Sequence, residues 1–505
     1  MRASFTLLML LMAVGVHGRS AFADSRGDEL ASWLDERGRE VWGAAGERCE
    51  DLTFARRAYL DLLGRVPSVS ELRDFQSLGD HRRNLLVDQL LFAEGPRAME
   101  YERLQSQHWA KQWRRVLLPP GTAVNGSPES LEAWLVDAFK QRLPYDEWMG
   151  QLARIPSPES SGGYYFLLGS LPENYAGHVS RVMLGVRIEC AQCHDHPFTD
   201  WKQQDFWGLA AFYSDLPRPG DNANASAPAE SKASIEYEGV TYAAKLLWDN
   251  QPLESQPIAL RSHLSHWLTA KENPQFASTA VNRIWQLLVG QGLYADVENL
   301  DLATRSERAF LDELGKRFAD GGFNMQVLIA AICKSDWYQV ASVDIAMNTD
   351  RFARTLKVLS PEQVFDSLEQ ALLLPVSRID PSSSRWSGDR MQLVSRLSET
   401  VGATPEDYAA GIPQALLLMN GKMTSDAIEP DRSRLLRAVS DAPFLSDHDR
   451  IKTLYLAVLT REPSADESAA LQDFVHAKSG EADRQRAFGE ILWALLNSPE
   501  FVLCR

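Results

Sequence analysis

The hydrophobic positions of this 505-residue chain recur mostly with the period of an α-helix. The clearest stripe occupies positions i, i+3, i+4, i+7 and i+8 of one helical face: Leu131, Trp134, Leu135, Ala138 and Phe139. Ser127 and Pro128 precede this stripe as a helix cap and a first-turn proline, and Pro144 closes the segment. Similar stripes predict helices at 85–92, 263–268, 310–318, 325–332 and 451–459. The pattern therefore predicts a mainly α, multi-helical protein.

One segment favours a strand conformation. Residues 235–247 are rich in β-branched and aromatic residues and are interrupted by Gly239, which predicts a small β-hairpin. The stretch before it, 217–233, is rich in Pro, Gly, Asn, Ala and Ser and is typical of a surface linker. We therefore expect two helical regions joined by a loop-rich linker: a signal peptide at 1–23, an N-terminal helical domain at 24–215, the linker and hairpin at 216–258, and a C-terminal helical domain at 259–505.

A nine-residue pattern occurs twice in the chain. Residues 59–67, followed by Glu71, have a counterpart in residues 455–463, followed by Glu467. Each copy predicts an apolar helix that ends near an arginine, a Pro-Ser turn, and a second helix with an acidic first turn. Two interpretations stay open at this point: two helix–turn–helix units that obey the same local rules, or an ancient duplication.

The N-terminus has the features of a secretory signal. Arg2 provides a positive charge, residues 5–16 are almost entirely apolar, and Ala21 and Ala23 are small residues at the positions that a signal peptidase reads. We expect cleavage after Ala23. The apolar run is shorter than the roughly 20 residues that span a bilayer, so a permanent anchor is the weaker alternative. The mature protein should have no integral membrane span and should be exported, in a periplasm or a similar space.

The net charge excludes some classes of binding partner, and the number of cysteines excludes a disulfide scaffold. The formal charge is −16, and removal of the signal changes it to −18, which argues against nucleic acid or an anionic membrane surface as a partner. Five cysteines are too few for a disulfide scaffold. Two of them stand together, and the others, Cys49, Cys333 and Cys504, are scattered, so at least one thiol is free or bonded to another molecule.

The most specific chemical signal is the run from Cys190 to His194, which has the form C-x-x-C-H. Two thiols at this spacing can each form a thioether with a haem vinyl group, and the following histidine supplies an axial imidazole to the iron. Covalently attached haem c is therefore the predicted cofactor, bound by Cys190, Cys193 and His194. Two alternatives remain: a zinc or other transition-metal site that adds His196 to these three residues, and a plain CxxC disulfide.

The opposite axial position needs a residue from elsewhere, since His196 is too close in sequence to His194 and Pro197 stiffens the chain after it. His196 is instead expected to form hydrogen bonds around the site or to fix the loop. The candidate distal ligands are His108, which is favoured, then His178, then Met183. A closed pair of ligands would favour electron transfer, whereas an open position would allow small-molecule or peroxide chemistry.

Several longer motifs resemble a known family. They are Phe54-x-Arg56-Arg57-x-Tyr59-Leu60-Asp61-Leu62-x-Gly64-Arg65-x-Pro67, His108-Trp109, Leu184-Gly185-Val186 with Cys190–Phe198, Asn273-Pro274-x-Phe276-Ala277, Val281–Trp285, Gly290-x-Gly292-Leu293 and Leu359–Gln363. Together they resemble exported bacterial proteins, abundant in planctomycetes, that consist of two consecutive domains of unknown function, a 1549-type followed by a 1553-type, and that are associated with cytochromes. The resemblance implies a secreted, redox-associated protein, without a substrate or an established activity.

These observations favour an exported c-type haem protein that serves periplasmic electron transfer or redox chemistry, with a periplasmic redox protein as its partner. The first alternative is a secreted non-haem binding or scaffold protein whose CxxC motif holds a metal or a disulfide. The second is a secreted enzyme that acts on envelope polysaccharide. The sequence has no phosphate-binding loop, nucleophile elbow or metalloprotease helix, and it assigns no catalytic residue.

Overall fold

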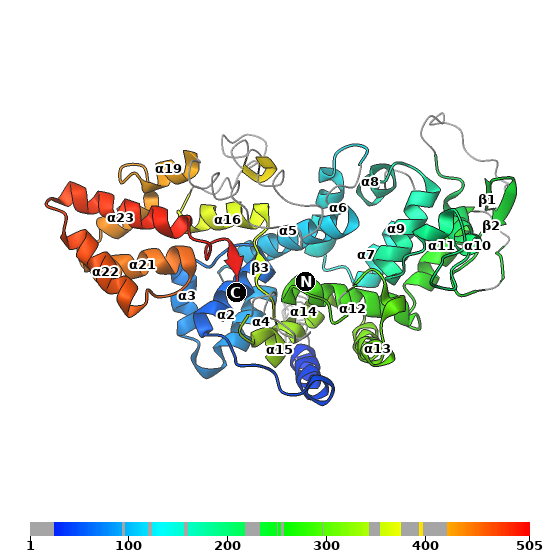
Figure 1. Ribbon diagram of the computed structural model, residues 1–505, viewed down its shortest axis with the longest axis horizontal. Helices are drawn as coiled ribbons and strands as arrows, with labels where there is room; N and C mark the ends of the chain where they lie inside the picture. The colour runs from blue at the N-terminus through cyan, green and yellow to red at the C-terminus, as the bar shows by residue number, and fades with distance from the viewer. Residues whose placement is uncertain are drawn as a thin grey trace, which may run out of the picture. The chain divides into compact units, whose positions relative to one another are not determined.

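The computed structural model describes residues 25–92, 96–119, 124–155, 160–217, 233–249, 251–253, 257–294, 296–342, 354–374, 393–396 and 422–505 (Figure 1). The expected signal peptide and most of the expected linker lie outside these ranges. The chain forms two compact units, and each combines two stretches of sequence. The first unit comprises the chain up to Leu30 together with Ser106–Ile332, and the second comprises Ala31–Gln105 and Cys333–Arg505. The domain boundaries expected near 215 and 259 follow the order of the sequence and stay a prediction.

The first unit is mainly helical and carries one two-stranded sheet. Its elements are α5 (Ala98–Leu117, which begins in the second unit), α6 (Glu129–Lys140), α7 (Tyr145–Arg154), α8 (Ser160–Leu167), α9 (Pro172–Leu184), η2 (Glu189–Gln192), α10 (Gln203–Ala210), η3 (Ala211–Tyr213), β1 (Ser234–Tyr237), β2 (Val240–Ala243), α11 (Pro257–Leu268), α12 (Pro274–Val289), η4 (Leu300–Leu302), α13 (Arg305–Asp320) and α14 (Met325–Lys334, which ends in the second unit). The helix α6 begins one residue later than expected. The Ser127 hydroxyl does not cap a backbone amide there, because it donates to the Glu129 carboxylate.

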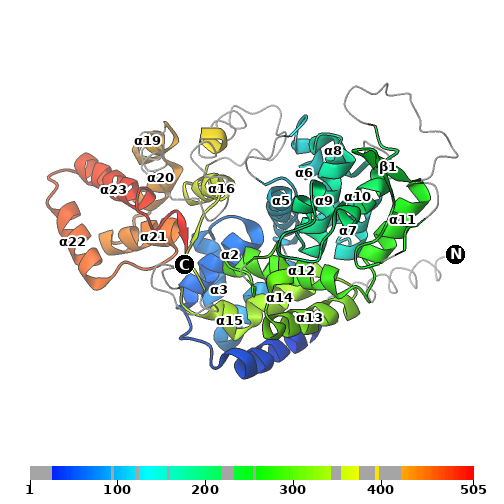
Figure 2. The ribbon, with the colours of Figure 1, turned by 45° about the vertical axis from the view of Figure 1, so that its right-hand side comes forward.

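The predicted hairpin is present as β1 and β2, and Figures 1 and 2 show it beside α10 and α11. Tyr237 pairs with Val240 across the turn, and Ile235 pairs with Tyr242. The two turn residues, Glu238 and Gly239, have φ angles of 49° and 79°, which is the conformation of a tight two-residue hairpin turn. Because paired residues lie on one face of a sheet, these four apolar or aromatic side chains share the same face.

The second unit begins with a helix at 31–42, which continues from residue 25, and contains most of the remaining helices. Its elements are α2 (Asp51–Leu63), α3 (Val69–Gln76), η1 (Gly79–His81), α4 (Arg82–Phe92), α15 (Asp336–Gln339), β3 (Lys357–Val358), α16 (Pro361–Ala371), α19 (Lys422–Ile428), α20 (Arg434–Ser440), α21 (Asp447–Leu459), α22 (Ala465–His476), α23 (Glu481–Leu496) and β4 (Leu503–Cys504). The antiparallel pair β3–β4 was not expected. The prediction of a mainly α-helical protein is confirmed.

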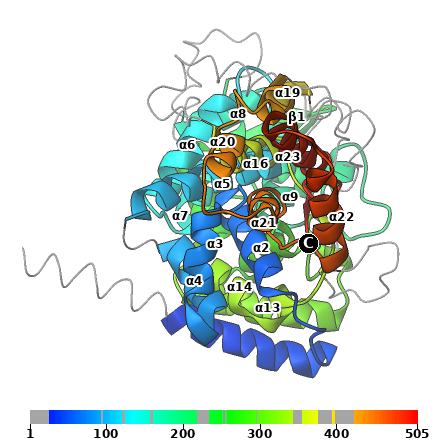
Figure 3. The ribbon, with the colours of Figure 1, turned by 90° about the vertical axis from the view of Figure 1, so that its left-hand side faces the viewer.

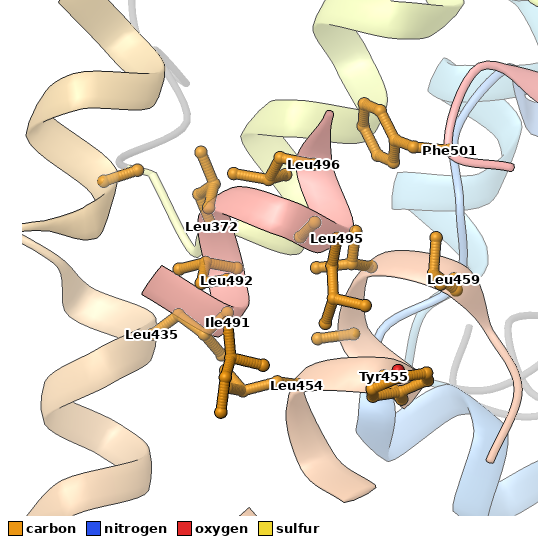
Figure 4. Close-up of a cluster of buried hydrophobic side chains, with 14 of the residues drawn as sticks. Leu372, Leu435, Leu454, Tyr455, Leu459, Ile491, Leu492, Leu495, Leu496 and Phe501 are labelled. Carbon is orange, nitrogen blue, oxygen red and sulfur yellow. The ribbon is translucent and has the colours of Figure 1, made fainter. Parts of the chain in front are cut away.

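A hydrophobic cluster holds the second unit together. Figure 4 shows Leu454 of α21 with Ile491, Leu492 and Leu495 of α23, and Leu435 of α20 lies beside them. Helices α2, α3 and α21 lie side by side in the view of Figure 3, and Leu60 of α2 belongs to the same cluster. Burial of an aliphatic side chain of this size contributes about 1.5–3 kcal/mol, so this cluster is a major source of stability for the unit.

The two copies of the repeated pattern fold alike. In the first, Arg65 donates to both carboxylate oxygens of Glu71 at 2.9 and 2.8 Å. In the second, Arg461 does the same to Glu467 at 2.7 and 2.8 Å. In both copies a serine and this glutamate form a capping box at the start of the second helix. The repeat is therefore structural: each copy is a helix, a turn and a helix clasped by a bidentate ion pair.

The isolated cysteines, the segment after α12 and the lengths of the helices complete the description of the fold. Cys49, Cys333 and Cys504 are buried, and none of the five cysteines is in a disulfide. Asn282 holds the segment that follows α12, since its amide donates to the Tyr294 carbonyl at 2.9 Å and accepts from the Tyr294 amide at 3.0 Å. Within the described ranges, none of the helices combines the length and the apolar character that a bilayer crossing requires.

Candidate functional site

The C-x-x-C-H run lies in the first unit, directly after α9. This helix ends at Gly185, whose φ of 59° suits glycine, and a Cβ there would lie 2.7 Å from the Thr279 hydroxyl. The chain then enters the 3-10 turn η2, where Ile188 and Ala191 are fully buried. With these two residues pointing inward, Cys190 and Cys193 are exposed to solvent. Cys190 lies within this turn, and Cys193 directly follows it as the C-cap residue, three positions later.

Helix α10 holds the backbone of this turn. The side-chain amide of Gln203 donates to the carbonyls of Gln192 and Cys193 at 3.3 and 3.2 Å. The indole N–H of Trp207 donates to the Gln192 carbonyl as well, at 3.0 Å. The Gln203 side chain is fixed in turn, because its oxygen accepts a hydrogen bond from the Tyr242 hydroxyl at 2.9 Å. The end of η2 is therefore held by α10 and the hairpin together.

His194 has one ring nitrogen engaged and one available. Its Nδ1 lies 2.8 Å from the Asp195 backbone carbonyl, and because a carbonyl oxygen can only accept, Nδ1 carries the proton. In the neutral imidazole Nε2 then has a lone pair, which is the form that binds a metal. The Asp195 carboxylate does not orient the ring, since it accepts from the Gln203 backbone amide at 3.0 Å.

His196 has a different role in the same loop. Its Nδ1 accepts hydrogen bonds from the backbone amides of Phe198 and Thr199 at 3.2 and 3.1 Å. Its own backbone amide donates to the Trp201 carbonyl at 2.8 Å, which closes the loop. Nδ1 of His196 is therefore not available as a ligand. Over the described ranges, no three His, Cys, Asp or Glu side chains converge as a metal site would require.

The hairpin forms an aromatic wall beside the second cysteine. Tyr237 lies beside Cys193, and desolvation, followed by the charges of Glu238 and Cys193, raises the pKa of this tyrosine. Trp207 stacks on the Tyr237 ring with 4.3 Å between centroids and 23° between planes, and on Tyr242 at 6.4 Å. The sequence predicts the hairpin itself, but not that it lies beside Cys193, because this contact comes from tertiary folding.

The candidate distal ligands lie on two helices. His108 is buried on α5 with its ring 6.1 Å from that of Trp109. His178 is on α9, where burial and then Arg181 lower its pKa to about 4. Its Nε2 lies 3.3 Å from an Arg181 nitrogen, so Nε2 accepts that hydrogen bond. Met183, also on α9, is fully buried, and its five-residue separation from His178 turns the two side chains about 140° apart. His178 and Met183 therefore do not share one face of α9, and His108 lies on a different helix.

Two arginines near the motif, Arg181 and Arg187, lie among acidic residues. Arg181 is 3.7 Å from the Glu189 carboxylate, and Arg187 is 3.5 Å from the Asp296 carboxylate. Burial is the main cause that raises the pKa of Glu189, which directly precedes the first cysteine of the motif. The surroundings of the motif are therefore strongly charged on the side of α9.

Comparison with known proteins identifies two domains. Residues 32–161 and 168–218 match PSCyt2, described as a protein of unknown function (DUF1549). Residues 260–384 match PSD1, described as a protein of unknown function (DUF1553). No curated protein and no solved structure matches the chain.

Proposed function

The chain belongs to the proteins in which a PSCyt2 domain is followed by a PSD1 domain, both of unknown function, and for this member we propose a haem-binding redox role. Cys190 and Cys193 would hold a c-type haem through thioether bonds, and His194 would bind its iron through Nε2. When bound, the haem supplies one-electron redox chemistry.

The observation that carries the proposal is the geometry of one short turn. It presents two exposed cysteines three residues apart and, next to them, an imidazole whose Nε2 is free of hydrogen bonds to the described residues. The aromatic wall of Trp207 and Tyr237 stands beside the second thiol, where an apolar macrocycle needs a nonpolar surface. The clamp from Gln203 keeps this turn in place without using either cysteine side chain.

Export is part of the proposal, because haem is attached to such motifs outside the cytoplasm. The sequence at 1–23 supports it, and the mature chain should begin at Asp24 and occur in a periplasmic or similar fraction. A periplasmic redox protein would then be the partner. N-terminal sequencing of the protein from fractionated cells checks the cleavage, and an intact Met1 on cytoplasmic protein would contradict it.

The direct test is expression together with a cytochrome c maturation system. Denatured protein should retain haem on a gel, and its pyridine haemochrome spectrum should be of the c type. Joint replacement of Cys190 and Cys193 by Ala should abolish both signals, whereas Cys49→Ala, at a buried thiol, serves as the matched control and should keep them. An intact mass equal to that of the polypeptide alone would refute the proposal.

The same turn favours one alternative. Because both cysteines are exposed and only three residues apart, they could also close a CxxC disulfide, and the protein would then be a secreted scaffold or thiol-redox protein. A mass two hydrogens below that of the reduced polypeptide, reversed by a reductant, would support this alternative. One zinc per chain would instead support the metal-binding alternative.

A further inference from the structure

Three arginines surround a single carboxylate beside the cysteine motif. Glu298, in the segment between α12 and α13, lies 3.6 Å from Arg181, 3.5 Å from Arg187 and 3.8 Å from Arg283. A charge-assisted hydrogen bond between such groups is usually about 2.7–2.9 Å long. Glu298 therefore balances part of the charge of all three guanidinium groups, and it makes a short hydrogen bond with none of them.

Arg283 on α12 is the deepest of the three, with only 4% of its side chain exposed. Its Nε and Nη2 atoms are buried and have no hydrogen-bond partner among the described residues, and the same is true of Nε of Arg181. A buried charged donor without a partner costs more than the about 1–3 kcal/mol of a neutral one. The cluster thus contains buried N–H donors of Arg283 and Arg181 that lack an acceptor, and an anion could provide that acceptor.

The other groups that face the cluster do not accept hydrogen bonds from these unpartnered donors. His178 accepts from Arg181 through Nε2 and is neutral above a pKa of about 4. Glu189 lies 3.7 Å from Arg181, and Asp296 contacts only the outermost arginine, Arg187, at 3.5 Å. Side-chain exposures of 49% for Arg187 and 39% for Glu189 show that the cluster is open to solvent on this side.

We propose that Arg181, Arg187 and Arg283 form a binding site for a carboxylate group, which Glu298 fills until a ligand carboxylate replaces it. Planar guanidinium groups match a carboxylate with two parallel hydrogen bonds, which the long contacts to Glu298 do not achieve. Glu298 lies in an irregular segment and is partly exposed, so its side chain can turn away. The ligand carboxylate is either a propionate of a haem attached at the motif, a source that rests on the proposed function, or that of a free organic acid.

Glu298→Gln tests the site in the full polypeptide made without haem. Removal of the internal carboxylate should lower the unfolding midpoint in a buffer whose only anion is a bulky sulfonate. Acetate at equal ionic strength should restore the midpoint, with half of the effect at a concentration at least tenfold lower than in the unchanged protein. The control is Glu313→Gln, since Glu313 is likewise a partly exposed glutamate in an ion pair, 39% exposed against 23% for Glu298, and its partner Arg317 lies on the same helix. Equal responses of the two variants to acetate, or equal effects of acetate and sulfonate, would overturn the proposal.

A second variant guards against a general effect of charge. Arg187→Gln alters the exposed rim of the cluster, and when combined with Glu298→Gln it should reduce the response to acetate at least several-fold while the protein stays folded. An undiminished response would also overturn the site. Repetition with haem-bearing protein separates the two sources: loss of the acetate response supports a propionate as the occupant, and its persistence supports a free carboxylate. If no haem attaches at all, the proposed function fails by mass, while the acetate test still decides on this site.

Discussion

The two copies of the repeated helix–turn–helix pattern allow the same arginine–glutamate ion pair to be compared at two degrees of burial. Arg65→Met removes the partner of Glu71, and Arg461→Met removes the partner of Glu467. Both pairs are bidentate and belong to the same helix–turn–helix pattern, and both acids have a pKa lowered to about 2. They differ in burial, because the side chains of the first pair are 6% and 3% exposed and those of the second are 28% and 36% exposed.

The expected magnitudes follow from this difference. A pKa that falls from 4.5 to about 2 corresponds to roughly 3 kcal/mol of interaction for a fully buried group. Breaking a buried pair on one side costs about 3–5 kcal/mol, so Arg65→Met should lower the free energy of unfolding by about 3 kcal/mol. Arg461 also donates to both carboxylate oxygens of Glu500, at 2.8 and 3.0 Å, but its pairs are screened by solvent, so Arg461→Met should still cost only about 1 kcal/mol.

The pKa of Glu71 determines how the stabilising effect of the Arg65–Glu71 pair changes with pH. Because the folded pKa of Glu71 lies below the unfolded value of 4.5, the pair stabilises the protein fully above pH 4.5, and the contribution is lost as the pH falls toward 2. The difference between the unchanged protein and Arg65→Met should therefore be largest near neutral pH and should shrink below pH 4.5. In the double variant with Glu71→Gln, where no unpaired charge is buried, more than half of the lost stability should return.

Hydrogen exchange measured by mass spectrometry suits this comparison, because it reports the opening of α2–α3 and of α21–α22 separately in a large protein. Urea unfolding followed by circular dichroism gives the global effect. Equal costs for Arg65→Met and Arg461→Met would refute the argument from burial. A cost of Arg65→Met that does not change between pH 7 and pH 3 would refute the argument from linkage.

Three more predictions can be checked with single substitutions. His178 has a folded pKa of about 4 and an unfolded value of 6.5, so stability should fall by about 2–3 kcal/mol as the pH drops from 6.5 to 4, and His178→Gln should remove this loss in a pH series of thermal unfolding. A Cβ at Gly489 would lie 2.3 Å from the Ile428 carbonyl, so Gly489→Ala should cost about 2 kcal/mol or more in urea unfolding, whereas Gly46→Ala, whose nearest atom is at 3.8 Å, should be close to neutral. Gln203→Glu removes the two hydrogen bonds to the carbonyls of Gln192 and Cys193. Iodoacetamide should then alkylate Cys190 and Cys193 several-fold faster, without loss of helical content. An unchanged rate of alkylation would contradict this prediction.

The elements that the sequence predicts are those with a strong local pattern. The apolar stripes at 85–92, 263–268, 310–318, 325–332 and 451–459 all fall within observed helices, because each has a buried face with a helical period. The hairpin at 234–243 was predictable for the same reason, with a period of two and a glycine in the turn. In contrast, β3 and β4 have two residues each and pair across 145 residues of chain, so neither strand leaves a periodic signal.

The same division applies to the candidate site. The residues that act through chain neighbours, such as His194 with Asp195 and His196 with Phe198, lie close together in sequence, so a short motif was enough to find them. The clamp from Gln203 is only ten residues away, yet its side-chain type carries no distinctive signal. Contacts that come from tertiary folding, such as Tyr237 beside Cys193, could not be deduced from spacing at all.

The repeated pattern shows how structure decides between interpretations that sequence leaves open. Shared local rules require a capping box in each copy, and both copies have one. They do not require the arginine after the first helix to bind the glutamate of the capping box. Nor do they require this arginine to lie over the ring of the tyrosine six residues before it, as it does at 5.7 Å in one copy and 5.1 Å in the other. Two independent features beyond the capping rule are therefore repeated at the same spacing, which favours a duplication. The two copies differ in burial, because Tyr101 encloses the first, with its hydroxyl donating to Glu71 at 2.9 Å, while the ion pair of the second is partly open to solvent.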